Sequence, residues 1–115
     1  KPPKEGGWNM FITNWVSADA SNPISNIAVG GQGKKGGWFG WAEDAKIEQL
    51  KDQFVRAASL DEQKKIATEI QKQAYDQVIY IPLGQYLAPS AWRKSLTGVI
   101  DGPATPVFWN IDKSE

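Results

Sequence analysis

Four side chains in the first part of the sequence have the chemistry of a binding site for a small cationic ligand. Asp19 follows Trp15 among Ser, Ala, Asn and Pro residues, and Trp38 and Trp41 stand in a glycine-rich segment. A carboxylate beside aromatic rings can pair with an ammonium group in a partly dry pocket. On spacing alone, an Asp in such a turn more often stabilises its own backbone, and Trp38 and Trp41 either line a pocket or pack the loop against a sheet. The candidate ligand-binding residues are therefore Trp15, Asp19, Trp38 and Trp41.

Patterns for catalysis or metal binding are weak. The 115-residue chain has no histidine and no cysteine, so it lacks the commonest general base, a thiol nucleophile and the usual zinc ligands. Asp19 with Glu43 or Asp44 could form the carboxylate pair of a hydrolase, which requires the carboxyl groups to lie about 5–10 Å apart across a cleft. Nothing in their spacing favours that arrangement. We expect a protein that is not an enzyme and that binds no cofactor and no metal.

A glycine motif at residues 31–36 matches the dinucleotide-binding fingerprint in letters only. The fingerprint functions because its glycines open a helix whose N-terminus faces a pyrophosphate. Here Gly37, Trp38, Phe39 and Gly40 follow directly, and no helical pattern begins before about Ala42. We interpret the segment as a mobile surface loop and expect no bound nucleotide.

The charge balance argues against nucleic acid as a partner. The chain has 13 Lys and Arg residues and 13 Asp and Glu residues, which gives a net charge of zero. Binding to nucleic acid usually needs a basic excess or a basic stripe. No stretch approaches the roughly 20 apolar residues of a membrane span. Because the sequence begins with Lys1 rather than Met, we expect a segment of a longer polypeptide.

Two helices and several strands are predicted to position these residues. Between Glu43 and Ala58, apolar residues recur at three- and four-residue spacings, which is typical of a helix with one buried face. Ser59 and Glu62 match a capping box, so a second helix should start near Ser59 and run to about Asp76. The short connection predicts that the two helices pack antiparallel. Strands are predicted at Trp8–Val16, Val78–Leu87 and Val107–Ile111.

These elements predict an α/β fold in which a small mixed sheet carries the antiparallel two-helix hairpin on one face. The chain contains six tryptophans, which is unusual for its length. Trp8 and Trp109 lie within strand-like runs, so we expect both in the core.

The order of these features resembles the C-terminal part of family 5 extracytoplasmic solute-binding proteins, the dipeptide, oligopeptide and nickel receptors of ABC importers. The resemblance spans roughly Trp8 to Ile111 and rests on the strand with Trp15, the aromatic-glycine loop and the capped helix after Ser59. It also rests on two segments further along, Val78-Ile79-Tyr80-Ile81-Pro82-Leu83 and Arg93-Lys94-Ser95-Leu96-Thr97-Gly98-Val99.

The resemblance implies a periplasmic or lipid-anchored receptor that binds a peptide or similar small solute between two lobes and delivers it to a membrane permease. The fold would be a fragment of a type II-like periplasmic binding protein lobe, with residues 1–88 in the C-terminal lobe and residues 89–115 forming strands of the other lobe. Asp19 matches the carboxylate that pairs with the amino group of the ligand, although Asn22 stands where an acid often precedes the proline. Without its partner lobe, the last segment would leave Trp92, Phe108 and Trp109 exposed or repacked through dimerisation or strand exchange.

One further alternative is a free-standing carbohydrate-binding module, in which tryptophan rings stack on sugar faces. It predicts that Trp38 and Trp41 are coplanar and face the solvent.

Overall fold

The computed structural model describes residues 3–100, 102 and 107–114. The chain divides into two compact units, Lys1–Pro82 and Leu83–Glu115, which we call the N-terminal and the C-terminal unit. Each unit is described by itself.

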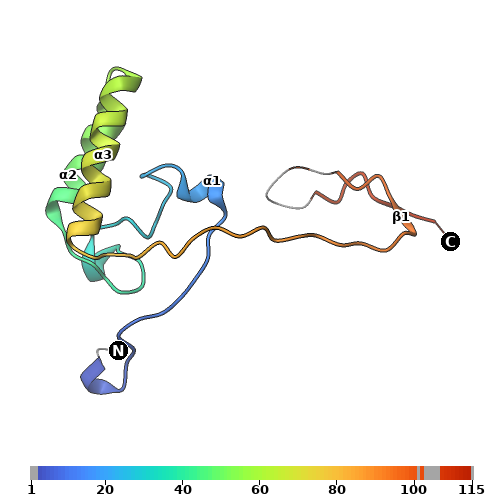
Figure 1. The fold of residues 1–115 in the computed structure, drawn as a ribbon, viewed down its shortest axis with the longest axis horizontal. Coiled ribbons are helices and arrows are strands. Elements are labelled where there is room, and N and C mark those ends of the chain that lie inside the picture. Colours follow the sequence, from blue (N-terminus) through green and yellow to red (C-terminus); the bar gives the residue numbers. More distant parts are fainter. Residues whose placement is uncertain (1–2, 101, 103–106, 115) are drawn as a thin grey trace. The chain divides into compact units, whose positions relative to one another are not determined.

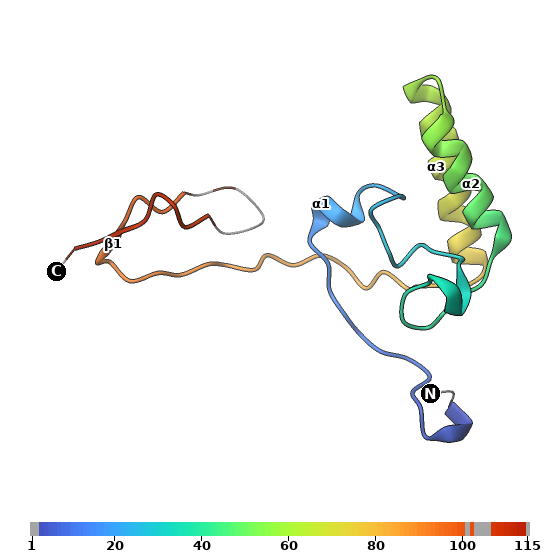
Figure 2. The ribbon, with the colours of Figure 1, turned by 180° about the vertical axis from the view of Figure 1, so that it is seen from behind.

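A helical hairpin dominates the N-terminal unit. Helices α2 (Ala45–Arg56) and α3 (Leu60–Asp76) lie side by side, joined by residues 57–59 (Figures 1 and 2). The Asp44 carboxylate caps α2 by accepting hydrogen bonds from the amides of Lys46 and Ile47. Such a cap satisfies amides that have no partner within the helix. Both predicted helices and their antiparallel packing are confirmed.

The capping box at the start of α3 forms with one difference from the expected pattern. The Ser59 hydroxyl accepts a hydrogen bond from the Glu62 amide at 3.2 Å, as predicted. The Glu62 carboxylate reaches back to the amide of Ala58, at 2.9 Å, rather than to that of Ser59. Both bonds satisfy backbone donors at the sharp connection between the helices, so the second helix begins where the sequence predicts.

The C-terminal end of α3 is a Schellman motif with valine in the position that usually holds glycine. The amide of Ile79 donates to the carbonyl of Ala74, and the amide of Val78 donates to the carbonyl of Tyr75. Val78 has a φ of 51°, in the left-handed region. A β-branched side chain is rare there because its Cβ crowds the backbone. The helix end is therefore strained.

The fully buried core is small and lies where the helical hairpin meets the segment before it. Among the described residues, the buried apolar side chains are Val29, Ile47, Ile70 and Ala74. Partly buried side chains pack around them: Leu50, Phe54, Ile66, Ile79 and Tyr80. The hairpin thus packs on irregular backbone of its own unit, and the prediction that it covers the face of a sheet is wrong for this unit.

Two predicted strands are absent from the described structure. Residues 8–16 are largely extended but belong to no sheet, and they lead into the short helix α1 (Ser17–Ala20). Residues 78–87 are also without strand structure. Extended backbone becomes a strand only when a neighbour accepts its ladder of hydrogen bonds. In addition, the left-handed Val78 ends α3, and Pro82 has no amide to donate.

The C-terminal unit holds the sheet of the described residues, and that sheet is antiparallel rather than mixed. Strand β1 (Leu96–Thr97) pairs with β2 (Asp112–Lys113), with Leu96 opposite Lys113 and Thr97 opposite Asp112. The predicted strand at 107–111 is a turn that precedes β2. Gly98 has a φ of 71° and lies against the Asn110 carbonyl, so a side chain would not fit there.

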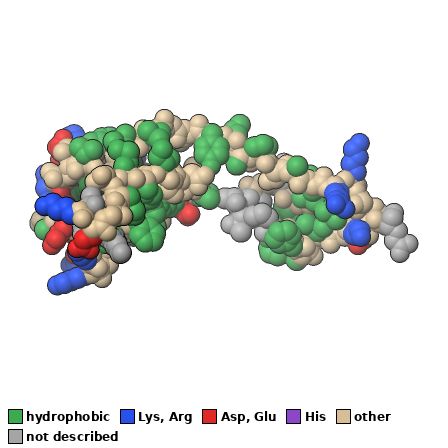
Figure 3. Space-filling view, turned by 90° about the horizontal axis from the view of Figure 1, so that it is seen from below, with side chains coloured by type: hydrophobic (Ala, Val, Ile, Leu, Met, Phe, Trp, Pro, Cys, Tyr) green, Lys and Arg blue, Asp and Glu red, His purple; other side chains and the backbone are tan. Residues whose placement is uncertain are grey.

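Large apolar side chains remain on the surface of both units, as Figure 3 shows for one face of the molecule. Trp109 is 83% exposed and Trp8 is 42% exposed, so the prediction that both lie in the core is wrong. The reason is that the strands expected to bury them have no sheet in the described residues. Of the two outcomes expected for Trp92, Phe108 and Trp109 in the last segment, exposed or repacked, the structure shows all three exposed.

Candidate ligand-binding site

Three of the four candidate residues belong to one group of aromatic rings. Trp15 meets Trp38 edge-on, with ring centroids 4.4 Å apart. Phe11 lies 5.0 Å from Trp38 and 4.9 Å from Trp8, and Trp8 stacks on Trp41 at 6.1 Å. We call this set the aromatic cluster; its members are Trp8, Phe11, Trp15, Trp38, Phe39 and Trp41.

The aromatic cluster joins two segments that are far apart in the sequence, the extended residues 8–15 and the glycine-rich loop at 38–41. Trp15, Trp38 and Trp41 are each half-buried, whereas Phe39 is exposed. Edge-to-face and offset contacts of this kind stabilise ring pairs beyond the area that they bury. The sequence analysis did not identify Phe11 and Phe39 as members of this group. The recurrence of aromatic residues at positions 8, 11 and 15 was a signal for Phe11.

Asp19 lies in the first turn of α1 and is exposed. Its backbone carbonyl accepts a hydrogen bond from the Ser25 hydroxyl at 2.8 Å, which ties the helix to the turn that follows. Within the part of the chain that the structure describes, the Asp19 carboxylate has no hydrogen-bond or ion-pair partner. The turn is stabilised instead by Asn22, whose side chain accepts from the Ile24 amide. The carboxylate of Asp19 is therefore available to a ligand.

The glycine-rich loop is tied down at its base, which the interpretation as a mobile surface loop did not anticipate. Gly31 and Gly33 are buried. The amide of Asp44 donates to the carbonyl of Gly31 at 3.0 Å, and the amide of Gly33 donates to the carbonyl of Ala42 at 2.8 Å. A Cβ at position 31 would collide with the Asp44 carbonyl. Here glycine permits a close approach of two backbone segments rather than mobility.

The Glu48 side chain connects this base to α2. Its Oε1 accepts from the amide of Gly31 at 2.7 Å, and its Oε2 accepts from the Gln32 side-chain amide at 3.1 Å. Lys51, one turn further along the same helix, donates to the Val29 carbonyl at 3.1 Å. The loop that carries Trp38 and Trp41 is thus held against the helical hairpin by charged side chains.

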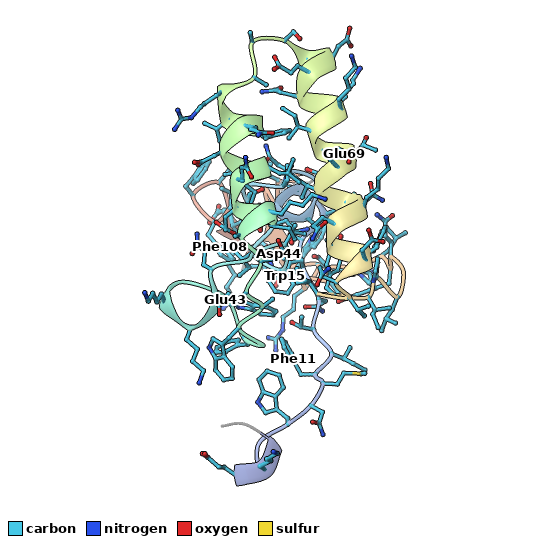
Figure 4. All side chains as sticks on the ribbon, turned by 90° about the vertical axis from the view of Figure 1, so that its left-hand side faces the viewer. Phe11, Trp15, Glu43, Asp44, Glu69 and Phe108 are labelled. Atoms are coloured by element: carbon cyan, nitrogen blue, oxygen red, sulfur yellow. The ribbon has the colours of Figure 1, made fainter. Side chains whose placement is uncertain are left out.

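Asp44 and Glu43, the acids of the hydrolase alternative, lie between the glycine-rich loop and α2 (Figure 4). Asp44 Oδ1 caps α2, and Oδ2 accepts from the Gln73 side chain at 2.7 Å. The Gln73 bond, followed by the amides of Ile47 and Lys46, holds the pKa of Asp44 below its ordinary value. A carboxylate that is ionised and engaged at both oxygens is poorly suited to act as a general acid.

Two hollows on the N-terminal unit lie away from the rings of the aromatic cluster. A depression of about 170 Å³ lies between Ser21–Pro23 and the helical hairpin, and a wider one lies on the hairpin itself. Neither is lined by a ring of the aromatic cluster. Trp38 and Trp41 are half-buried against other rings, which does not fit the solvent-facing platform of a carbohydrate-binding module.

Residues 3–100, 102 and 107–114 contain neither a metal-binding cluster nor a membrane-spanning helix. No group of three or more acidic side chains is placed to hold a metal ion. None of the helices there is both long enough and apolar enough to cross a membrane.

Comparison with known proteins supports the predicted resemblance. Over 110 residues, or 95% of its length, the chain is 41% identical to the probable peptide ABC transporter periplasmic-binding protein y4tO of Sinorhizobium fredii. The chain spans about a fifth of that relative, 20% of its length. No family model matches the chain, and no solved structure matches it. In sequence, the chain therefore corresponds to about a fifth of that probable peptide ABC transporter periplasmic-binding protein.

Proposed function

We propose that this chain is part of the substrate-binding component of an ABC importer for peptides or similar small solutes. The observation that carries the proposal is the 41% identity, over nearly the whole chain, to a protein named as a probable peptide ABC transporter periplasmic-binding protein. The weak catalytic chemistry of the sequence agrees with a role in binding rather than in catalysis.

The complete receptor would bind its solute in a cleft between two lobes of type II-like fold and deliver it to membrane permease subunits. Residues 1–88 would belong to the C-terminal lobe, and residues 89–115 would supply strands to the other lobe. The receptor would be periplasmic or anchored by lipid outside the cytoplasm. In the isolated chain, the exposed apolar side chains would favour a dimer or strand exchange.

The ligand-binding residues in this proposal are Trp15, Asp19, Trp38 and Trp41. The half-buried rings would form a rigid apolar wall, and the exposed Asp19 carboxylate would pair with the ammonium group of the solute. Two observations support this assignment: Trp15 and Trp38 are in direct ring contact, and the Asp19 carboxylate has no hydrogen-bond or ion-pair partner within the described residues.

Isothermal calorimetry on the complete receptor tests the proposal, with short peptides that carry either a free or an acetylated amino terminus. We expect binding of the free peptides and a loss of about tenfold or more in affinity on acetylation, because the ammonium group is removed. Asp19→Asn should weaken binding of free peptides by a similar factor and leave acetylated peptides unaffected. Asp52→Asn, which changes another exposed acid, is the matched control.

These measurements test the proposed peptide-binding function and the proposed role of Asp19 separately. A receptor that binds no peptide contradicts the function itself. A receptor that binds free and acetylated peptides equally well, with or without Asp19, retains the function but excludes the assigned role of Asp19. The 115-residue chain alone should bind peptides weakly or not at all, because a cleft needs both lobes.

A further inference from the structure

The aromatic cluster depends in part on the position of the glycine-rich loop. Trp38 and Trp41 lie in the segment between Gly31 and Asp44, where the backbone is rich in glycine and therefore loses much conformational entropy on ordering. A pair of backbone hydrogen bonds and a single bridge between Gln32 and Glu43 close the loop at its base. Beyond this base, the loop contains the 3-10 helix Gly33–Lys35 and local backbone hydrogen bonds from the amide of Gly37 to Gly33 and from that of Trp41 to Trp38. Its rings contact one another and residues 8–15.

Trp41 adds strain to this loop. Its φ is 50°, in the left-handed region, which a bulky side chain adopts only at a cost relative to the ordinary helical conformation. The conformation turns the chain directly before Ala42, whose carbonyl accepts from Gly33. A strained residue persists only where its surroundings determine the backbone on both sides. An anchor on another element would add to the backbone bonds that hold the base of the loop.

Glu48 is the side chain in position to do so. It lies on α2 and is half-buried, and its two carboxylate oxygens accept from two consecutive residues of the loop, Gly31 and Gln32. Charge-assisted hydrogen bonds of this kind are roughly twice as strong as neutral ones. The helix that carries Glu48 contributes Ile47 to the core, so the anchor is rigid.

We propose that Glu48 is a positioning residue for the ligand wall: its carboxylate fastens the glycine-rich loop to α2 and so sets where Trp38 and Trp41 lie. The role of this wall in ligand binding rests on the proposed function, whereas the anchoring of the loop does not. Glu48 acts on the loop through Gly31 and Gln32 rather than on the rings themselves.

Near-ultraviolet circular dichroism of the 115-residue chain tests the anchoring, because coupled tryptophan rings give a signal that vanishes when their geometry is lost. Glu48→Ala should reduce the aromatic signal to about half or less, while the far-ultraviolet helix signal stays unchanged because alanine favours helix. Glu48→Gln keeps an acceptor for the Gly31 amide and should retain most of the signal. Glu69→Ala, at an exposed ion pair on α3, is the matched control and should change neither spectrum.

An aromatic spectrum of Glu48→Ala that matches the parent overturns the proposal. If Glu48→Ala instead loses its helix signal, Gln32→Ala decides the question, because it removes one bond of the anchor without changing α2. A reduced aromatic signal with intact helices then supports the anchoring, and an unchanged one overturns it.

A second arm on the complete receptor measures peptide affinity. Glu48→Ala should weaken binding by about tenfold, and Trp38→Ala in the same background should add little, because the wall is already displaced. If the parent receptor binds no peptide, the proposed function fails while the spectra still decide the anchoring. If affinity is unchanged although the aromatic signal is lost, the loop is anchored by Glu48 but forms no ligand wall, and the proposal is overturned.

Discussion

Single carboxylates of this chain have different tasks that the sequence does not distinguish. Asp19, Asp44 and Glu48 all stand near glycine, proline or helix boundaries. In the structure, Asp44 is a helix cap joined to Gln73, Glu48 fastens a loop, and the Asp19 carboxylate is exposed. The tasks of Glu48 and Asp44 depend on hydrogen-bond donors that lie 17 and 29 positions away in the sequence, on Gly31 and Gln73 respectively.

Removing the cap of α2 should destabilise the protein. Asp44→Ala should lower the free energy of unfolding by about 1 kcal/mol, because it leaves two helix amides without their acceptor. Asp44→Asn keeps an oxygen that can cap and should cost less near neutral pH. Urea denaturation followed by circular dichroism measures both, and equal stability of the alanine variant and the parent would contradict the prediction.

Asp44 should also make the stability of the protein depend on pH. The folded pKa of Asp44 lies below its ordinary value of 3.8, so its contribution is complete above that value and is lost as pH falls through the folded pKa. The parent should therefore lose stability on acidification below pH 3.8, and Asp44→Asn should lose less. Denaturant midpoints measured over a pH series provide the check; parallel curves for the two proteins would exclude the linkage.

The close approach of the Asp44 backbone to Gly31 leads to a prediction, for which the neighbouring Gly30 provides the control. Gly31→Ala should destabilise the chain by about 1–3 kcal/mol, because the added methyl group meets the Asp44 carbonyl. At Gly30 the nearest atom to an added Cβ is 3.6 Å away, so Gly30→Ala should change stability by no more than about 0.5 kcal/mol. Thermal melting of the two variants measures the difference. A Gly31→Ala variant as stable as Gly30→Ala would show that the base of the loop can move to accommodate the methyl group.

At the scale of elements, the helical hairpin forms because each boundary is specified locally. Asp44 and Ser59 cap the two helices, and the apolar stripes face each other through Ile47 and Ile70. The exception is the end of α3, where Val78 adopts a left-handed conformation that suits glycine. The fold tolerates this strain because Ile79 must follow at once to pack on the core.

Relief of that strain should stabilise the hairpin. Val78→Gly should raise the free energy of unfolding by about 0.5–1 kcal/mol, since Val78 is mostly exposed and little buried area is lost. Val55→Gly removes a similarly exposed valine from inside α2 and should have the opposite sign. The melting temperatures of the two variants and the parent provide the comparison. A lower melting temperature for both variants would show that position 78 is not strained.

At the scale of the whole molecule, much of the apolar surface has no covering in the described residues. Leu87 is 95% exposed, and Leu83, Phe108 and Trp109 of the C-terminal unit are also exposed. Monomeric proteins rarely leave large contiguous apolar patches open to water.

The isolated chain should therefore self-associate as its concentration rises. Sedimentation velocity should show the average mass increasing with concentration, and Leu87→Lys together with Trp109→Lys should reduce the effect. Lys substitution at Met10, an exposed residue of the N-terminal unit, serves as the comparison. A single monomeric species at all concentrations would contradict the prediction.

The sequence by itself determined the features that depend on neighbours in the chain. The helices at Glu43–Ala58 and Ser59–Asp76 were predictable to within about two residues, because caps and apolar spacing act over three or four positions. The resemblance to solute-binding proteins was also visible in the order of motifs. The strands expected at Trp8–Val16 and Val78–Leu87 do not form in the described residues. Local sequence could not decide this, because a strand also needs a neighbouring strand to pair with.

Only the tertiary structure decided how the candidate site is assembled. The spacing of Trp15, Trp38 and Trp41 left open whether their rings meet, and the structure places them in one cluster with Trp8, Phe11 and Phe39. It also decided that the glycine-rich loop is fixed and that Glu48 holds it. The physical reason is that ring contacts and buried amide bonds join residues distant in sequence, and no local pattern encodes which of them will meet.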